Sequence, residues 1–129
     1  MKTRVWARWA PALLWMGVIF AFSQHSNIKT GLSCDFSIKK TAHFFEYGLL
    51  ALAFYHSLKG PWRICQPTIA QKAWALATLY AVTDEFHQWF IPTRTATPRD
   101  VVIDSIGAAT ILAVFFVVSR IRHKESSKS

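Results

Sequence analysis

The sequence predicts an all-α integral membrane protein, a four-helix bundle with both termini in the cytoplasm. Hydrophobic residues make up 52% of the 129 residues and aromatic residues 15%, which is more apolar surface than one domain of this size can bury. The net charge is +8, yet the basic residues separate apolar runs instead of gathering on one solvated face. We therefore expect a multi-pass protein of the inner (cytoplasmic) membrane that contacts membrane lipid and does not bind nucleic acid.

A single domain is expected to cover residues 1–129. Its helices are expected at about residues 9–24, 38–58, 72–91 and 98–121. The first is an uncharged run that begins at Trp9, with Pro11 in its first turn, where proline is tolerated. This run is slightly short for a span that needs ~20 residues. A cleaved signal peptide that ends near Ala21-Phe22-Ser23 is the alternative interpretation.

Capping residues mark the start of the second and fourth helices. Ser37 is a candidate cap for the second helix. The fourth begins with the pattern of a capping box, with Thr97 as the cap, Pro98 in the first turn and Asp100 as the acid that reaches back to the cap. After this helix, residues 122–129 are expected to form a polar, disordered tail.

The distribution of basic residues sets the orientation of the bundle. Four helices place both termini on one side, and the side with more Lys and Arg is the cytoplasmic one. Ten basic residues fall on the side of the termini, namely Lys2, Arg4, Arg8, Lys59, Arg63, Lys72, Arg120, Arg122, Lys124 and Lys128. Five fall on the other side, namely Lys29, Lys39, Lys40, Arg94 and Arg99. Cys34 and Cys65 lie on opposite sides in this topology and lack metal-type spacing, so we interpret both as incidental.

Acidic residues on three helices are expected at one depth, about 10 Å below the outer surface at a rise of about 1.5 Å per residue. They are Glu46, Asp84, Glu85 and Asp104. Helical periodicity places other residues on these faces. They are Lys40, His43 and Tyr47 beside Glu46, Gln88 beside Asp84, and Asp100 and the small Gly107 beside Asp104. Each ionised group costs ~2.5–3.5 kcal/mol inside a bilayer unless it is paired, protonated or hydrated. The sequence therefore predicts that these faces meet around an outward-facing polar cavity.

The polar residues divide into two groups of candidates. Candidates for acid/base or hydrogen-bonding roles are Glu46, Asp84, Glu85 and Asp104. No catalytic residue is assigned among them, so whether the protein is an enzyme stays open. Candidates for ligand binding are Lys40, His43, Tyr47, Gln88, Arg94, Arg99 and Asp100. Of these, the basic side chains suit anionic headgroups.

Structural interpretations stand beside several of these assignments. Asp100 is equally well explained as the acid of the capping box. Arg94 and Arg99 also suit anchors at phosphate headgroups, and Gln88 suits a hydrogen bond that joins two helices. For the four acids together, the structural interpretation is a polar network that only holds the bundle together.

No metal ion or cofactor is expected. His43 with the nearby carboxylates is a reasonable ligand set, but no helix carries an HExxH pattern. His87 points about 60° away from Asp84 by helical geometry, so we leave it out of the site.

Four motifs carry a resemblance to a known family. They are Phe22-Ser23-Gln24, Lys40-x-x-His43-Phe44-x-Glu46-Tyr47-x-x-Leu50, Asp84-Glu85-x-x-Gln88, and Pro92-x-Arg94 followed by Asp100-x-x-x-Asp104-x-x-Gly107. Together they span nearly the whole chain, which resembles the VanZ-like family of small bacterial membrane proteins. Thr93 stands where the family usually has the glycine of Pro-Gly-Arg. The resemblance implies a four-helix membrane fold and a link to resistance against teicoplanin, a glycopeptide that acts on the cell wall, and it implies no catalytic residue.

The predicted function is binding of, or action on, an envelope lipid, a lipid-linked intermediate or a glycopeptide at the outward-facing cavity. Two alternatives remain open. A proton-coupled small transporter would use the acids as a relay, but the apolar stretches at 49–54, 74–80 and 114–118 offer almost no polar groups in the cytoplasmic half. A structural or assembly protein would use the polar network only to fix helix packing.

Overall fold

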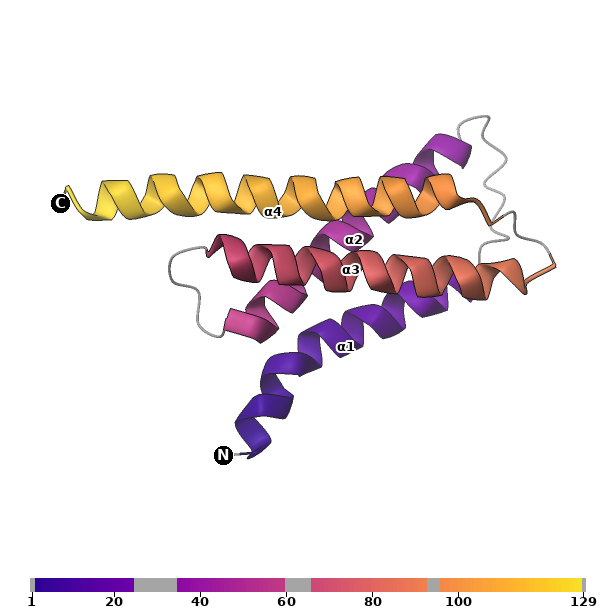
Figure 1. The fold of residues 1–129 in the computed structure, drawn as a ribbon, viewed down its shortest axis with the longest axis horizontal. Helices are drawn as coiled ribbons and strands as arrows, with labels where there is room; N and C mark the ends of the chain where they lie inside the picture. Colours follow the sequence, from indigo (N-terminus) through magenta and orange to yellow (C-terminus); the bar gives the residue numbers. More distant parts are fainter. Residues whose placement is uncertain (1, 25–34, 60–65, 93–95, 129) are drawn as a thin grey trace.

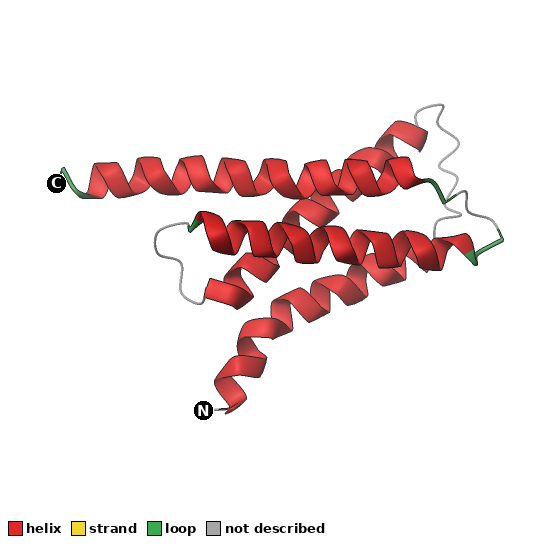
Figure 2. Ribbon diagram, viewed as in Figure 1, coloured by secondary structure: helices red, strands yellow, loops and turns green. Residues whose placement is uncertain are grey.

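The computed structural model describes residues 2–24, 35–59, 66–92 and 96–128. Within these ranges the chain is helical apart from short turns and helix ends (Figure 2). The helices are α1 (Lys2–Gln24), α2 (Asp35–Lys59), α3 (Pro67–Trp89) and α4 (Pro98–Ser126). The prediction of an all-α chain with four helices is therefore confirmed.

Successive helices run in opposite directions, and α2 lies at the centre (Figure 1). It packs against each of the other three helices, whereas α1 packs against α2 and α3 and, within the described ranges, does not contact α4. This arrangement gathers the C-terminal ends of α1 and α3 and the N-terminal ends of α2 and α4 at one end of the molecule. Both chain termini lie toward the opposite end (Figure 1).

Two helices begin well before the predicted residues. The third predicted helix starts at Pro67 rather than residue 72, because proline at the first helical position loses no hydrogen bond that the helix would make. The first starts at Lys2 rather than Trp9, so Pro11 lies inside α1 and not in its first turn. The predicted starts were wrong because they were placed where the apolar runs begin, whereas backbone hydrogen bonding continues through the polar residues before those runs.

The ends of α2 and α4 differ from the prediction in the same way. Because α2 starts at Asp35, Ser37 lies within the helix rather than at its cap, and the backbone carbonyl of Ser37 accepts a hydrogen bond from the Thr41 hydroxyl at 2.8 Å. The last helix continues to Ser126, so residues 122–126 are helical instead of disordered. This extension carries the basic C-terminal residues beyond the other helices (Figure 1).

Helices α2 and α4 cross at two glycines. A Cβ atom on Gly107 would lie 2.3 Å from the backbone carbonyl oxygen of Phe44, and one on Gly48 would lie 2.4 Å from Cγ1 of Ile111. Any larger residue at Gly107 would therefore push the backbones of the two helices apart. Small residues allow this kind of close approach, which dispersion forces then stabilise.

The core combines small and aliphatic residues with a few aromatic ones, and many other large apolar residues lie on the outside. Fully buried positions include Ala12, Leu50, Ala51, Ala73 and Ala77. Exposed large apolar side chains occur on every helix, for example Leu14, Phe45, Leu79 and Val114. By length and composition, α1 (from Arg4) and α4 are each apolar and long enough to cross a membrane. Such extensive exposure of large apolar side chains is typical of proteins that contact lipid.

Candidate functional site

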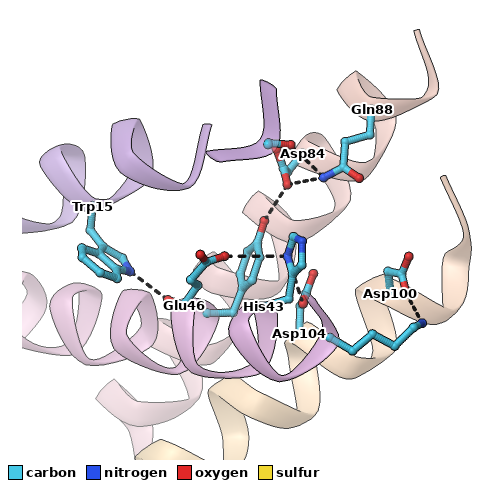
Figure 3. A network of polar contacts seen from close by, with 10 residues as sticks. Trp15, His43, Glu46, Asp84, Gln88, Asp100 and Asp104 are labelled. Atoms are coloured by element: carbon cyan, nitrogen blue, oxygen red, sulfur yellow. Dashed lines mark hydrogen bonds and ion pairs between the residues drawn. The ribbon is translucent and has the colours of Figure 1, made fainter. Parts of the chain in front are cut away.

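Polar side chains from all four helices meet at the end of the bundle away from the chain termini (Figure 3). We call this group the polar cluster; it consists of Ser23, Lys40, His43, Glu46, Tyr47, Asp84, Glu85, Gln88, Asp100 and Asp104. The cluster holds five of the seven acidic residues in a chain with a net charge of +8. The structure therefore brings together the faces that helical periodicity selects on α2, α3 and α4.

The buried half of the cluster is a chain of hydrogen bonds centred on Asp84. The Tyr47 hydroxyl donates to Oδ2 of Asp84 at 3.2 Å, and the Gln88 amide donates to the same oxygen at 2.8 Å. The Gln88 amide also donates to the Ser23 hydroxyl at 2.8 Å. Tyr47 is 0% exposed, Asp84 5% and Gln88 3%. Tyr47 and Gln88, both predicted ligand-binding residues, are thus covered and engaged with other side chains of the protein.

The partly exposed part of the cluster, which we call the rim, consists of Lys40, His43, Glu46 and Asp100. The Lys40 ammonium lies 2.6 Å from Oδ1 of Asp100, which joins α2 to the first turn of α4. Nδ1 of His43 lies 3.9 Å from Oε2 of Glu46 and 3.8 Å from Oδ1 of Asp104. The four rim side chains are between 21% and 29% exposed, so they are accessible to a ligand. The His43 ring stacks on the buried Tyr47 ring, with centroids 6.3 Å apart, which links the rim to the buried half.

Two buried carboxylate oxygens have unused hydrogen-bonding capacity. Among the described residues, Oδ1 of Asp84 and Oδ1 of Asp104 accept no hydrogen bond. Leaving a buried acceptor unsatisfied costs about 1–3 kcal/mol, and such atoms in folded proteins usually meet water, a proton or a ligand. Both side chains are buried, but Oδ1 of Asp104 lies 3.8 Å from Nδ1 of His43, a residue of the partly exposed rim. It can accept a hydrogen bond from a group that enters past the rim.

Glu85, and not Asp100, binds the backbone N–H at the start of α4. Thr97 lies at the N-cap of α4, but its side chain makes no capping bond. The backbone N–H of Thr97, which a capping-box acid would bind, donates instead to Oε1 of Glu85 on α3. The carboxylate of Asp100 is paired with Lys40. The structure thus places Asp100 in the polar cluster and gives the capping role to Glu85, which ties the end of α3 to the start of α4.

Replacing Glu85 with alanine is expected to loosen the start of α4. The change removes the acceptor for the Thr97 N–H and the negative charge near a helix N-terminus, and loss of a cap costs about 1 kcal/mol. We expect faster amide hydrogen exchange at Thr97 and in the first turn of α4, with the centre of the helix unchanged. Glu85→Gln is the control, because its amide oxygen can still accept the bond. Equal protection in the alanine and glutamine variants would contradict the capping role.

The remaining predicted residues lie at the edge of the cluster or outside it. Arg99 is exposed at the start of α4, and Arg94 lies outside the described residues, as do Cys34 and Cys65. His87 faces α1 instead of the cluster. Its Nε2 lies 3.3 Å from Nε2 of Gln24, and its ring meets the edge of Phe20 at a centroid distance of 4.9 Å.

The contribution of α1 is the part that reasoning from charge missed. Ser23 accepts the hydrogen bond from Gln88, and Nε1 of Trp15 donates to the backbone carbonyl of Glu46 at 2.9 Å. The Tyr80 hydroxyl donates to the Met16 carbonyl at 2.7 Å. Because α1 has no charged residue near this end, the only sequence signal was the Phe22-Ser23-Gln24 motif. Its serine lies at the same end of the bundle as Gln88.

The surroundings of the cluster limit the chemistry available to it. Among the described residues, no group of three or more His, Cys, Asp or Glu side chains is arranged to hold a metal ion. On the side toward the chain termini, the next buried layer contains Leu50, Ala51, Phe54, Ala77 and Leu112. The cluster therefore combines proton donors and acceptors at one end of the bundle with an apolar layer behind it. This arrangement is suited to hydrogen bonding and proton exchange with a group that approaches from the end away from the chain termini.

Comparison with protein families matches residues 5–119 to the VanZ/LLP1 family. The matched range includes α2 and α3 in full, most of α1 and α4, and every member of the polar cluster. Neither a curated protein nor a solved structure matches the chain.

Proposed function

Because the chain belongs to the VanZ/LLP1 family, we propose that it is an integral membrane protein of the cell envelope whose polar cluster binds an envelope ligand. In this proposal all four helices cross the inner membrane, the chain termini are cytoplasmic, and the polar cluster opens to the outer side. The ligand carries a headgroup rich in hydrogen-bond donors, such as the sugar of a lipid-linked intermediate or a glycopeptide.

The dimensions of the helices support the membrane location. Helices α2 and α3, which carry most of the polar cluster, have 25 and 23 residues. At about 1.5 Å per residue each is about 35 Å long or more, which exceeds the ~30 Å hydrocarbon core of a bilayer. Their polar side chains turn toward one another, whereas α1 and α4 are apolar enough to cross a membrane. The excess of Lys and Arg on the side of the termini favours a cytoplasmic location for that side.

The observation that supports the ligand proposal is the excess of acceptors at the partly exposed rim and directly beneath it. Lys40 is already paired with Asp100, so its charge is offset and an anionic headgroup gains little there. Glu46 and the unsatisfied oxygen of Asp104 instead offer acceptors on either side of His43. Hydroxyl and ammonium groups are the complementary partners, and their hydrogen bonds to carboxylates are about twice as strong as neutral ones. Sugars and glycopeptides present such groups.

The geometry favours binding at the rim over passage of protons or solutes through the bundle. A relay needs polar groups through the apolar half, and among the described residues the buried layer behind Tyr47 is formed by Leu50, Ala51 and Phe54. A role that only fixes helix packing suits the buried half of the cluster, where Tyr47 and Gln88 donate hydrogen bonds to Asp84. The rim side chains are 21–29% exposed, which supports ligand binding there.

Replacing Glu46 with glutamine is expected to weaken ligand binding without unfolding the protein. The change keeps size and the half-exposed position but removes one ionised acceptor, whose hydrogen bonds contribute about 1.5–3 kcal/mol, or about tenfold or more in affinity. We would measure binding of teicoplanin and of a diglucosyl diacylglycerol to purified protein. We would also measure teicoplanin susceptibility of cells that produce each variant. Glu125→Gln is the matched control, because Glu125 is exposed near the end of α4.

Three results separate the proposal from its alternatives. Binding of either probe that is lost in Glu46→Gln and kept in Glu125→Gln supports it. Equal affinity of the two variants, or no binding of either probe by the wild-type protein, contradicts it and favours a purely structural cluster. Recovery of the protein from carbonate-washed membranes tests the membrane location separately, and a soluble protein would contradict that part.

A further inference from the structure

A groove lies between the N-terminal part of α3 and the middle of α4, and no residue of the polar cluster lines it. It has a volume of about 420 Å³, and its walls include Ala70 and Trp74 on α3 and Ala109, Ala113 and Phe116 on α4. This volume falls within the range of about 300–1,000 Å³ that is usual for small-molecule sites. Apart from Gln71 the walls are apolar, and the small residues keep the groove open, so an acyl chain fits it.

The groove ends at a basic surface. One turn beyond Phe116, the Arg120 guanidinium lies over the Phe116 ring at 4.8 Å from its centroid. Arg120 also lines a neighbouring hollow at the end of α4, together with His123, Lys124, Ser127 and Lys128. In the described part of the chain, no carboxylate forms an ion pair with Arg120. An apolar groove and a basic hollow therefore adjoin along one face of α4.

We propose that this groove binds one glycerophospholipid with an anionic headgroup from the cytoplasmic leaflet, with an acyl chain between α3 and α4 and the phosphate at Arg120. The proposal rests on the membrane location proposed above but not on the ligand of the polar cluster. Charge complementarity identifies the occupant, because the basic hollow suits a headgroup with net negative charge. Guanidinium groups bind phosphate with two parallel hydrogen bonds, and the planar group keeps its edges available while its face rests on an aromatic ring.

The headgroup of the lipid, rather than its acyl chain, decides which lipid binds. Lipid tails are as apolar as the walls of the groove, so moving a chain from the bilayer into the groove gains little free energy. Specificity therefore depends on Arg120, which shares the face of α4 with Ala109, Ala113 and Phe116. Arg122 lies about 200° around the helix from Arg120 at about 100° per residue. It has the same charge at nearly the same depth, which makes it a matched control.

Native mass spectrometry of the protein with phosphatidylglycerol and phosphatidylcholine of equal chain length tests the proposal. We expect the wild-type protein to retain one phosphatidylglycerol in preference to phosphatidylcholine. Arg120→Gln should reduce the retained phosphatidylglycerol about fivefold, the equivalent of one basic contact to an anionic lipid, and Arg122→Gln by less than about twofold. Ala113→Phe, which fills the groove, should reduce it as well. Val114→Phe, on the outward face of α4, should not.

Each other outcome overturns the proposal. Equal losses in Arg120→Gln and Arg122→Gln would show general attraction to the basic end of α4. Unchanged retention in Ala113→Phe would show that no chain occupies the groove, and a protein dimer lost in that variant would assign the groove to a second copy. Glu46→Gln is expected to retain phosphatidylglycerol normally, so failure of the polar-cluster proposal and failure of this one are distinguishable.

Discussion

Replacing Gly107 with alanine is expected to destabilise the bundle more than the same change at Gly17 or Gly48, the other glycines that the structure describes. The new Cβ would lie 2.3 Å from the carbonyl oxygen of Phe44, a backbone atom that cannot rotate away. The helices α2 and α4 would have to separate along their whole crossing. Overpacking of this kind costs about 1–3 kcal/mol, and valine at the same position should cost more. Unfolding of the purified protein by a denaturing detergent would measure the change in free energy.

The chain supplies two matched controls for this experiment. At Gly48 the nearest atom is Cγ1 of Ile111, at 2.4 Å from the added Cβ, and a side chain can change its rotamer. We therefore expect Gly48→Ala to cost less than Gly107→Ala. At Gly17 nothing lies within 4 Å, so Gly17→Ala should be neutral or slightly stabilising, because alanine favours the helix. Equal stability of the Gly107 and Gly17 variants would contradict the close crossing.

Helical periodicity accounts for most of the site that was predicted. Lys40, His43, Glu46 and Tyr47 follow one another at spacings of three and four or directly adjoin, so they share one face of any regular helix. That reasoning needs no knowledge of the neighbouring helices. It also needs no accurate helix ends, which explains why the face of α2 was predicted although the start of the helix was not.

Periodicity does not tell which neighbour a side chain meets. Asp84 and Glu85 are adjacent in sequence, but about 100° of rotation separates them. Asp84 points into the buried half of the cluster, whereas Glu85 reaches the backbone of Thr97. The difference depends on the rotation of α3 relative to α4, which is set by tertiary packing. Asp100 was open between two roles for the same reason, since only the position of α2 brings Lys40 to it.

The division of the cluster into a buried half and a rim also depends on packing. Tyr47 and His43 lie one turn apart on the same face, yet Tyr47 is 0% exposed and the His43 side chain 21%. The close α2–α4 crossing at Gly48 and the Tyr80 ring, whose centroid is 6.3 Å from that of Tyr47, cover the inner residue. A sequence can indicate that both are polar and inward-facing. Their depth in the bundle decides that only the outer one is accessible to a ligand.

Replacing Asp84 with leucine is expected to destabilise the protein by about 2–6 kcal/mol, because two buried donors each lose an acceptor at a cost of about 1–3 kcal/mol. The Tyr47 hydroxyl and the Gln88 amide both donate to Oδ2 of Asp84. Leucine is close in volume, so packing changes little and the effect reports the hydrogen bonds. Loss of the Tyr47 bond alone, in Tyr47→Phe, should cost less, since Gln88 still donates to Asp84.

The double variant Tyr47→Phe/Asp84→Leu measures the interaction energy between Tyr47 and Asp84 separately from the effects of the two single changes. Removing the hydroxyl as well as the carboxylate leaves one unsatisfied donor instead of two. The double variant should therefore be more stable than the sum of the single changes predicts, by about 0.5–3 kcal/mol. Additive effects would show that Tyr47 and Asp84 do not interact. A carboxylate with a structural role stabilises the protein whether or not a ligand is present. If Asp84→Leu instead kept full stability but lost binding of the probes that test Glu46, Asp84 would be a ligand-binding residue, like those of the rim.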